Sequence, residues 1–295
     1  MSPRTHLQEE GDIVYIHPSD VTNAMLCGQR VIQQHEEGSV KVFGEALVFG
    51  LMLHEQANDV VTEAKTLTGV KTKGYLEKVF TNLLEKDLEV SVDYVTLKER
   101  NDLFDELRYA INQWSKNFIG VHDKLLDDIV AAEETLEVDL GVLRDGRALR
   151  LRGTPDLVSK LKITDWKSSG RPWKPGKAQT SIQPPLYRHL VRENYETDPK
   201  QFMFAVYARN KGVWDIILTD RSEEQISAML KTVQDYAEGI YTGILPATPI
   251  AQGGFPPKRG WYCSVKWCDQ WNICSYKYLA DDVDESTVKE LKWKI

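Results

Sequence analysis

The residues best suited to chemistry are two aspartates and a lysine near the middle of the chain. Gly153-Thr154-Pro155-Asp156 ends one predicted strand, and Asp165-Trp166-Lys167 lies in the next. Strands lying next to each other would point both carboxylates at one spot, with Lys167 on the same face as Asp165. Two carboxylates can hold a hard divalent ion that polarises a phosphate and activates water, while the ammonium orients or stabilises what the ion does not reach. This pattern predicts metal-assisted phosphodiester hydrolysis.

The four cysteines are a second candidate site. Cys27 lies near the start of the chain, and Cys263, Cys268 and Cys274 lie together near its end. Four thiolates satisfy a soft metal or an iron–sulfur cluster, so the set is typical of a site that ties the two chain ends together. Free buried cysteines are one alternative. Disulfides are disfavoured because no secretory signal is visible, and zinc usually takes two local ligand pairs, so a cluster is favoured over zinc.

Composition sets bounds on the function. The chain has 295 residues, of which 42% are hydrophobic, so it can bury a sizeable core in one large domain or two smaller ones. No apolar run approaches the roughly 18 residues of a membrane span, and we expect a soluble intracellular protein. The net charge of -7 argues against general binding of polyanions.

The charge is unevenly spread along the chain. Residues 77–139 carry seven Lys or Arg against sixteen Asp or Glu, whereas residues 160–177 carry six Lys or Arg against Asp165 alone. The second stretch is a local basic strip that can approach a nucleic-acid backbone without reading its sequence. Its candidate DNA-binding residues include Arg171, Lys174 and Lys177.

Hydrophobic periodicity predicts the elements that must position these residues. The first third of the chain is predicted to be mostly helical, and turn signals then separate short strands from helices. The first two strands are predicted to form a hairpin at Asp145-Gly146. The predicted helices cover 41–66, 98–129, 184–195 and 222–240, and the predicted strands cover 134–142, 148–160, 161–169, 201–209 and 212–220. The order indicates a compact α/β domain.

These motifs together resemble the PD-(D/E)XK nuclease superfamily, specifically its RecB-like branch. The similar segments are GTPD at 153–156, ITDWKSS at 163–169, and QPPLY at 183–187, whose Gln183 and Tyr187 resemble a Q-x-x-x-Y motif. Gly50 and His54 resemble the helical G-x-x-x-H motif of that branch. The cysteines resemble those of its iron–sulfur nucleases, including the AddB nuclease domain and the CRISPR-associated exonucleases, although the spacing here is C-x4-C-x5-C where those relatives commonly show C-x2-C-x5-C.

The resemblance implies a restriction-endonuclease-like core, with a mixed central sheet flanked by helices, a helical N-terminal part and a C-terminal cysteine cluster. It implies three regions: residues 1–130, contributing Cys27 and His54; the nuclease core at 131–245; and the iron–sulfur region at 246–295, all within one integrated domain. A Gly- and Pro-rich linker at 245–260 leads into the last of these.

The resemblance also implies the ligands and roles of individual residues. Mn²⁺ or Mg²⁺ would be held by His54, Asp156, Asp165 and the backbone carbonyl of Trp166, and a 4Fe-4S cluster by the four cysteines. The catalytic set would be Asp156, Asp165, Lys167, Gln183 and Tyr187. The acidic residues Glu133, Glu134 and Glu137 either bind a second ion or water, or are simply the solvated start of a strand.

We therefore expect a DNA exonuclease acting on single-stranded or end-accessible DNA in recombination, repair, or CRISPR or phage DNA processing. It would act in the cytoplasm of a bacterial or phage-infected cell. One alternative is a structure-selective endonuclease, and another is a DNA-end-binding partner protein with secondary nuclease activity. The chain shows no phosphate-binding loop of an ATPase, so coupling to a helicase would require a partner protein, and a recombination or CRISPR protein is a further candidate partner.

Overall fold

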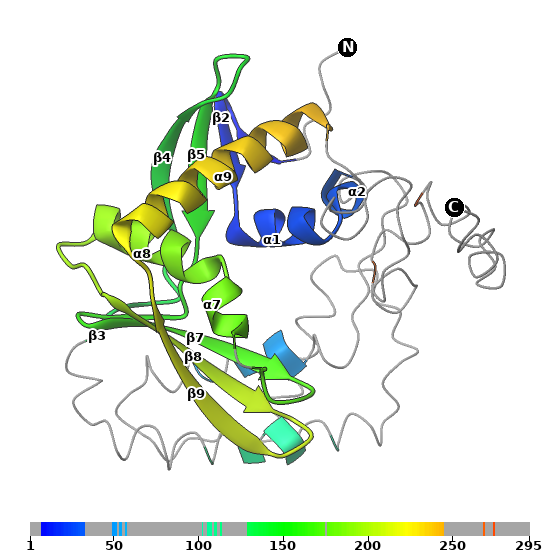
Figure 1. The fold of residues 1–295 in the computed structure, drawn as a ribbon, viewed down its shortest axis with the longest axis vertical. Coiled ribbons are helices and arrows are strands. Elements are labelled where there is room, and N and C mark those ends of the chain that lie inside the picture. The colour runs from blue at the N-terminus through cyan, green and yellow to red at the C-terminus, as the bar shows by residue number, and fades with distance from the viewer. Residues whose placement is uncertain are drawn as a thin grey trace, which may run out of the picture. The chain divides into compact units, whose positions relative to one another are not determined.

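The computed structural model describes residues 7–32, 49–51, 53, 54, 57, 102, 105–107, 109, 110, 113, 129–174, 176–244, 268 and 274 (Figure 1). The chain divides into two compact units. The first comprises Met1–Val42, Gly141–Leu149 and Thr232–Ile295, and the second comprises Phe43–Leu140 and Arg150–Lys231. The division into three regions expected from the sequence stays a prediction. Within the described residues, no helix combines the length and the apolar character that crossing a membrane requires.

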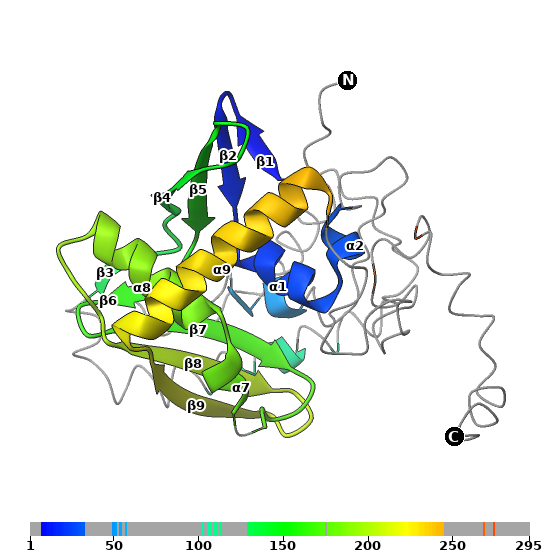
Figure 2. The same ribbon diagram turned by 45° about the horizontal axis from the view of Figure 1, so that its top comes forward.

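The second unit is built on a five-stranded sheet in the order β3-β6-β7-β8-β9. Its strands are β3 (Ile129–Ala132), β6 (Leu157–Ser159), β7 (Lys162–Ser169), β8 (Gln201–Ala208) and β9 (Val213–Asp220). Strands β7 and β8 are parallel and the other neighbours are antiparallel, so the sheet is mixed, as predicted. Figure 2 shows β3 and β6 next to each other at one edge.

The parallel pair is joined by a helical crossover, because parallel strands cannot be joined by a tight turn. The crossover contains α7 (Lys177–Thr180) and α8 (Gln183–Asn194). Pro184 and Pro185 occupy the first turn of α8, where a missing N–H costs no intrahelical hydrogen bond. Every residue of β8 after Gln201 is buried, which is the pattern of a central strand covered on both faces.

A helical segment covers the face of β7 and β8 that carries Ser168 and Tyr207. Phe49, Leu53 and Ala57 are all helical and buried, and their spacing places them on one side of a helix. The ring of Phe49 stacks on Tyr207 of β8 with centroids 5.8 Å apart. A Cβ on Gly50 would lie 3.2 Å from the hydroxyl oxygen of Ser168, so the missing side chain lets this helix approach β7 closely. The remaining parts of the predicted helices at 41–66 and 98–129 lie largely outside the described residues.

A four-stranded sheet has the order β1-β2-β5-β4. Its strands are β1 (Gln8–Glu10), β2 (Ile13–Ile16), β4 (Leu136–Val142) and β5 (Ala148–Gly153), and β4 and β5 each run through both units, as does α9 (Glu223–Thr242). In the first unit, α1 (Pro18–Leu26) and α2 (Gly28–Ile32) follow the β1–β2 hairpin. There the hydroxyl of Tyr241 donates to Asp145 at 2.5 Å, and Arg147 pairs with Glu9 at 2.9 Å.

One expectation differs from this arrangement, and another is incomplete. Most described residues in the first third of the chain are helical, as predicted, but an antiparallel hairpin of β1 and β2 precedes the helices. The expected strand over 148–160 is two strands, β5 and β6, in different sheets. Pro155 lies at the break, where its fixed φ and missing N–H are incompatible with continuous pairing. The predicted hairpin before it is confirmed, because β4 and β5 are neighbours.

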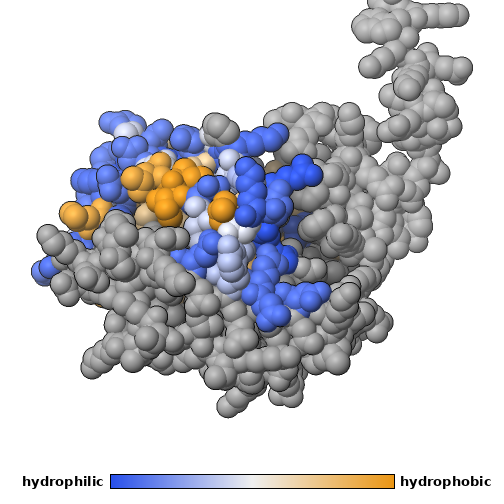
Figure 3. Space-filling view, turned by 90° about the horizontal axis from the view of Figure 1, so that it is seen from below, coloured by the Kyte–Doolittle hydropathy of each residue, from blue (hydrophilic) through white to orange (hydrophobic). Residues whose placement is uncertain are grey.

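On the face seen in Figure 3, the described residues form an apolar area bordered by hydrophilic residues. Strand β9 lies at an edge of the five-stranded sheet among the described strands, and its Ile216 and Leu218 are exposed.

Candidate active site

The two aspartates stand opposite each other at the end of a strand pairing. Leu157 of β6 pairs with Thr164 of β7, so Asp156 and Asp165 occupy the next positions. Both are buried, with 6% and 1% of their surface exposed. The backbone N–H of Trp166 donates to Oδ2 of Asp156 at 2.5 Å. Since the N–H and C=O of one strand residue point to the same side, the Trp166 carbonyl also faces the edge at which Asp156 lies.

Lys167 pairs with the second aspartate. Its Nζ lies 2.5 Å from Oδ2 of Asp165. Burial is the main cause that raises the pKa of Asp165 to about 6; the charge of Asp156 acts in the same direction, and Lys167 opposes both. Burial acts to lower the pKa of Lys167, but the two carboxylates outweigh it and leave the pKa raised, so this lysine stays an ammonium. The pair gives the site a cation next to two carboxylates.

His54 and Glu133 complete a cluster around Asp156. The Nδ1 of His54 lies 3.4 Å from Oδ1 of Asp156 and 3.9 Å from Oε1 of Glu133. Burial alone would lower the pKa of His54, but its contact with Asp156 outweighs this and raises the pKa. Glu133 follows β3 with a positive φ of 50°, and its backbone N–H donates to the carbonyl of Asp156 at 3.1 Å.

The cluster has the donor set of a divalent-cation site. Ligand atoms of His54, Glu133 and Asp156 lie within 4.8 Å of one another. Burial, and then repulsion from the charge of Asp156, raise the pKa of Glu133 to about 7. A divalent cation would offset that repulsion, and carboxylates with an imidazole suit such an ion. The residues present therefore fit a divalent metal.

Helix α8 brings Gln183 to the site and Tyr187 beside it. The Nε2 of Gln183 donates to Oδ1 of Asp165 at 3.3 Å. Tyr187 is hydrogen-bonded to Gln183, and burial followed by the charge of Asp165 raises its pKa well above the ordinary range. A Cβ on Gly153 would meet Tyr187 Cε1 at 3.0 Å and Leu190 Cδ1 at 2.8 Å. The glycine of GTPD thus allows the helix to pack against the strand.

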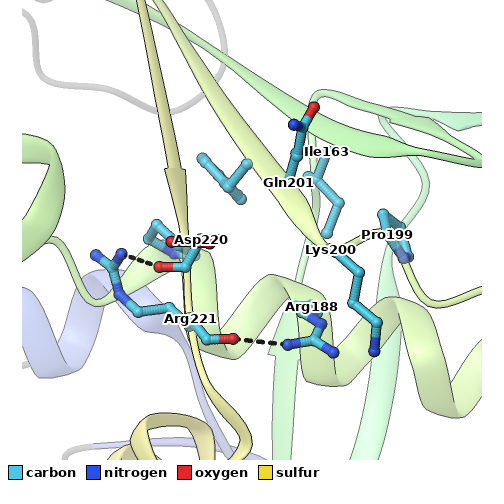
Figure 4. A pocket seen from close by; sticks show the side chains of 9 residues that line it. Ile163, Arg188, Pro199, Lys200, Gln201, Asp220 and Arg221 are labelled. Atoms are coloured by element: carbon cyan, nitrogen blue, oxygen red, sulfur yellow. Dashed lines mark hydrogen bonds between the residues drawn. The ribbon is translucent and has the colours of Figure 1, made fainter.

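The back of α8 is fixed by Arg188, which is 4% exposed. Figure 4 shows its guanidinium directed at the carbonyl of Arg221. Its guanidinium donates to both carboxylate oxygens of Asp198 at 2.8 and 3.0 Å, to Glu223 at 2.6 Å, and to the carbonyl of Arg221 at 2.8 Å. The hydrogen bonds from Arg188 hold the pKa of Asp198 well below its usual range. This network holds the helix that carries Gln183 and Tyr187.

The other acidic candidates have structural partners instead. Glu134 accepts a hydrogen bond from the hydroxyl of Tyr195 at 2.7 Å, and Glu137 pairs with Arg152 at 2.7 Å. Of the three acids whose role the sequence left open, Glu133 is therefore the one in the candidate site. In the sequence, Glu133 differs from Glu134 only by lying one residue earlier, directly before the predicted strand over 134–142.

The structure describes three of the four cysteines and the three candidate DNA-binding residues of the basic strip. Cys27, Cys268 and Cys274 are half-buried and none of the three is in a disulfide, while Cys263 lies outside the described residues. A cluster at these thiols stays a prediction. Arg171 and Lys174 are exposed in the segment between β7 and α7, and Lys177, the first residue of α7, is exposed as well.

Comparisons with known proteins agree with this geometry. The sequence profile of the PD-(D/E)XK nuclease superfamily matches residues 27–275. No curated protein sequence matches the chain. A crystal structure from Eubacterium rectale, provisionally described as an exonuclease, is similar with a TM-score of 0.51 and 13% identity, covering 78% of this chain and 82% of that one. The structure of SSO0001 covers 92% of this chain and 90% of that one at 13% identity, but its TM-score of 0.43 is too low to support an argument. From the profile match, the chain belongs to the PD-(D/E)XK nuclease superfamily.

Proposed function

We propose that this nuclease is a divalent-metal-dependent DNA exonuclease that hydrolyses phosphodiester bonds of single-stranded or end-accessible DNA. The observation that carries the proposal is the cluster of His54, Glu133 and Asp156 beside the Asp165–Lys167 pair. Such a set combines ligands for an ion with an ammonium that can meet a phosphate, as hydrolysis of a phosphodiester requires.

The ligands would be His54, Asp156, Asp165 and the carbonyl of Trp166, with Glu133 as a further ligand directly or through water. When bound, the ion would supply Lewis-acid chemistry and lower the pKa of a water molecule. Imidazole ligation favours manganese over magnesium somewhat, because imidazole suits softer ions. The Trp166 N–H holds Asp156 in the orientation that such a ligand needs.

The remaining residues would handle charge and position. Lys167 donates to the phosphate oxygen that becomes more negative as water attacks, and Asp165 holds the ammonium there. Gln183 fixes the other oxygen of Asp165, and Tyr187 fixes Gln183. No side chain would need to act as a general base, because an ion that lowers the pKa of a bound water would let that water lose its proton to solvent.

DNA is the proposed substrate because the exposed residues Arg171, Lys174 and Lys177 follow β7, next to the site. Contacts from such residues to phosphates do not depend on sequence. The setting we propose is recombination, repair, or CRISPR or phage DNA processing in the cytoplasm, with a helicase or a recombination or CRISPR protein as partner.

Purified protein, end-labelled linear DNA and closed circular DNA test the mode of attack. With Mn²⁺ or Mg²⁺, linear DNA should be degraded progressively to short products and closed circles should persist. Asp165→Asn protein, prepared in parallel, should degrade neither. Discrete bands from the closed circle with untouched linear ends would contradict the exonuclease and support an endonuclease.

We further propose that Cys27, Cys263, Cys268 and Cys274 hold a 4Fe-4S cluster that joins the two ends of the chain, with zinc as the alternative. Protein purified without oxygen should then be brown, absorb broadly near about 400 nm, and contain iron and sulfide. Replacing Cys27 should destabilise the protein as much as replacing Cys274, since metal-binding energy at such sites is folding energy. Colourless, metal-free protein prepared in this way would contradict the cluster.

A further inference from the structure

A tryptophan and a lysine are in contact in the segment that follows β7. The Nζ of Lys177 lies over the ring of Trp173, 4.1 Å from its centre. A cation–π contact of this kind contributes about 0.5–1 kcal/mol at an exposed site, and tryptophan is the strongest aromatic partner. Because an exposed lysine otherwise samples many rotamers, the contact restricts where its ammonium lies.

Trp173 is itself fixed on the face of the sheet that carries Asp165 and Lys167. Its ring packs on Phe204 of β8 with centroids 5.0 Å apart. Phe204 is the residue that pairs with Asp165 of β7, and paired residues of neighbouring strands point to the same face. Trp173 is thus separated from Asp165 by a single side chain. Burial and then the charge of Lys167 lower the pKa of Lys177, which agrees with this proximity.

The same contacts decide between two roles for Trp173. A half-exposed tryptophan beside a nuclease site can stack an unpaired base. Here, however, Lys177 lies over the ring face, and the indole Nε1 is buried with no hydrogen-bond partner among the described residues. Neither that face nor the N–H is offered to a base. The group offered to solvent is the ammonium of Lys177, which suits a phosphate.

We propose that Trp173 positions Lys177 to bind the backbone phosphate next to the one that is cleaved, an inference that rests on the proposed function as a DNA nuclease. Lys177 then has a defined place relative to Lys167, whereas Arg171 and Lys174 contribute a general attraction. A contact of this kind fixes the register of the strand and carries no sequence information.

Steady-state cleavage of labelled single-stranded DNA by the full chain in Mn²⁺ tests this proposal. Lys177→Ala should raise KM about fivefold near 0.1 M salt and lower the salt slope of log(kcat/KM) by about 0.7, because one phosphate contact is lost. The kcat should change by less than about twofold, since uniform binding is removed. Lys231→Ala, which removes an exposed lysine of α9, is the matched control and should change neither KM nor the slope.

Variants of Trp173 test the positioning role. Trp173→Leu should raise KM as Lys177→Ala does, and Trp173→Phe should restore most of the loss because phenylalanine keeps an aromatic face. The double variant Trp173→Leu/Lys177→Ala should be no worse than Lys177→Ala, because one residue acts through the other.

Three results would overturn the proposal: an unchanged KM in Trp173→Leu, additive effects in the double variant, or a loss of kcat at constant KM in Lys177→Ala. Wild-type protein that cleaves no DNA would contradict the proposed function instead. In that case, the Kd of the same oligonucleotide would be measured by fluorescence anisotropy in Ca²⁺. The Kd should rise in Lys177→Ala and in Trp173→Leu, and most of the rise should be absent in Trp173→Phe.

Discussion

The backbone N–H of Trp166 donates to the Oδ2 of Asp156, with N and O 2.5 Å apart. This contact is made just before β6 begins, where the edge of β7 is no longer paired with it. The Asp156 carboxylate accepts the hydrogen bond that a neighbouring strand would otherwise accept from this N–H. One hydrogen bond therefore pairs a buried backbone group of β7 and also holds a proposed metal ligand in a fixed orientation.

Replacing Asp156 should affect both stability and hydrolysis. In Asp156→Ala, the buried N–H of Trp166 loses its acceptor, which costs about 1–3 kcal/mol of unfolding free energy. Hydrolysis should fall by more than about 100-fold, because removing a residue that only supports a metal ligand through a hydrogen bond already costs up to about 100-fold. Asp215→Ala on β9 is the control and should retain both the stability and the hydrolytic activity of the wild type. Denaturant titration and DNA cleavage measure the two effects, and wild-type cleavage by pure Asp156→Ala protein would refute the assignment.

The packing of α8 predicts an asymmetry between two glycines. Gly153→Ala should lower the unfolding free energy by about 1–3 kcal/mol, because the new methyl group overpacks against Tyr187 and Leu190. Gly170→Ala meets no atom within 4 Å and should leave stability nearly unchanged. Since Tyr187 holds Gln183, Gly153→Ala should also lower kcat. Equal stability of the two variants in thermal unfolding would show that α8 does not approach Gly153 so closely.

The raised pKa of Glu133 predicts how stability without metal depends on pH. Its pKa is about 7 in the folded protein against an ordinary 4.5, so the folded state binds this proton more tightly than the unfolded state. The stabilisation is complete below pH 4.5 and is lost as the pH rises to 7. Glu133→Gln should flatten this decline.

Added Mn²⁺ should act in the opposite direction, because it needs the charged carboxylates. The increase in Tm on adding Mn²⁺ should therefore be larger at pH 8 than at pH 6 in the wild type, and this difference should shrink in Glu133→Gln. Thermal unfolding with and without Mn²⁺ across this range measures both effects. A metal-induced increase in Tm that is the same at both pH values would contradict the placement of Glu133 at the ion.

Lys167 should matter to stability as well as to hydrolysis. Lys167→Met removes the charge that lowers the pKa of buried Asp165, so that pKa should rise above about 6. At pH 8 the variant leaves an unpaired buried carboxylate, and its unfolding free energy should fall by several kcal/mol, as when a buried pair is broken at a cost of about 3–5 kcal/mol. At pH 5, where Asp165 protonates, the difference from the wild type should shrink. Lys231→Met is the control, and a loss that does not depend on pH would contradict a pair between Lys167 and Asp165.

The sequence predicts the site better than the framework around it. Asp156 and Asp165 are close in the sequence and lie on adjacent antiparallel strands, which a short turn can join. Their spacing therefore predicts that they meet, with Lys167 on the same face as Asp165. Glu133 could not be separated from Glu134, because its position depends on the pairing of β3 with β6 and on a backbone with positive φ. Likewise, the place of β2 beside β5 is a pairing between distant segments that no local periodicity records.

Manganese binding measured by electron paramagnetic resonance, together with DNA cleavage on the same samples, tests the central claim most directly. We expect the wild type to bind Mn²⁺ and cleave DNA, Asp156→Asn and His54→Ala to lose both together, and Asp215→Asn to keep both. Wild-type Mn²⁺ affinity in Asp156→Asn, or cleavage of DNA by the wild type in EDTA, would contradict the claim that this cluster holds the ion that drives hydrolysis.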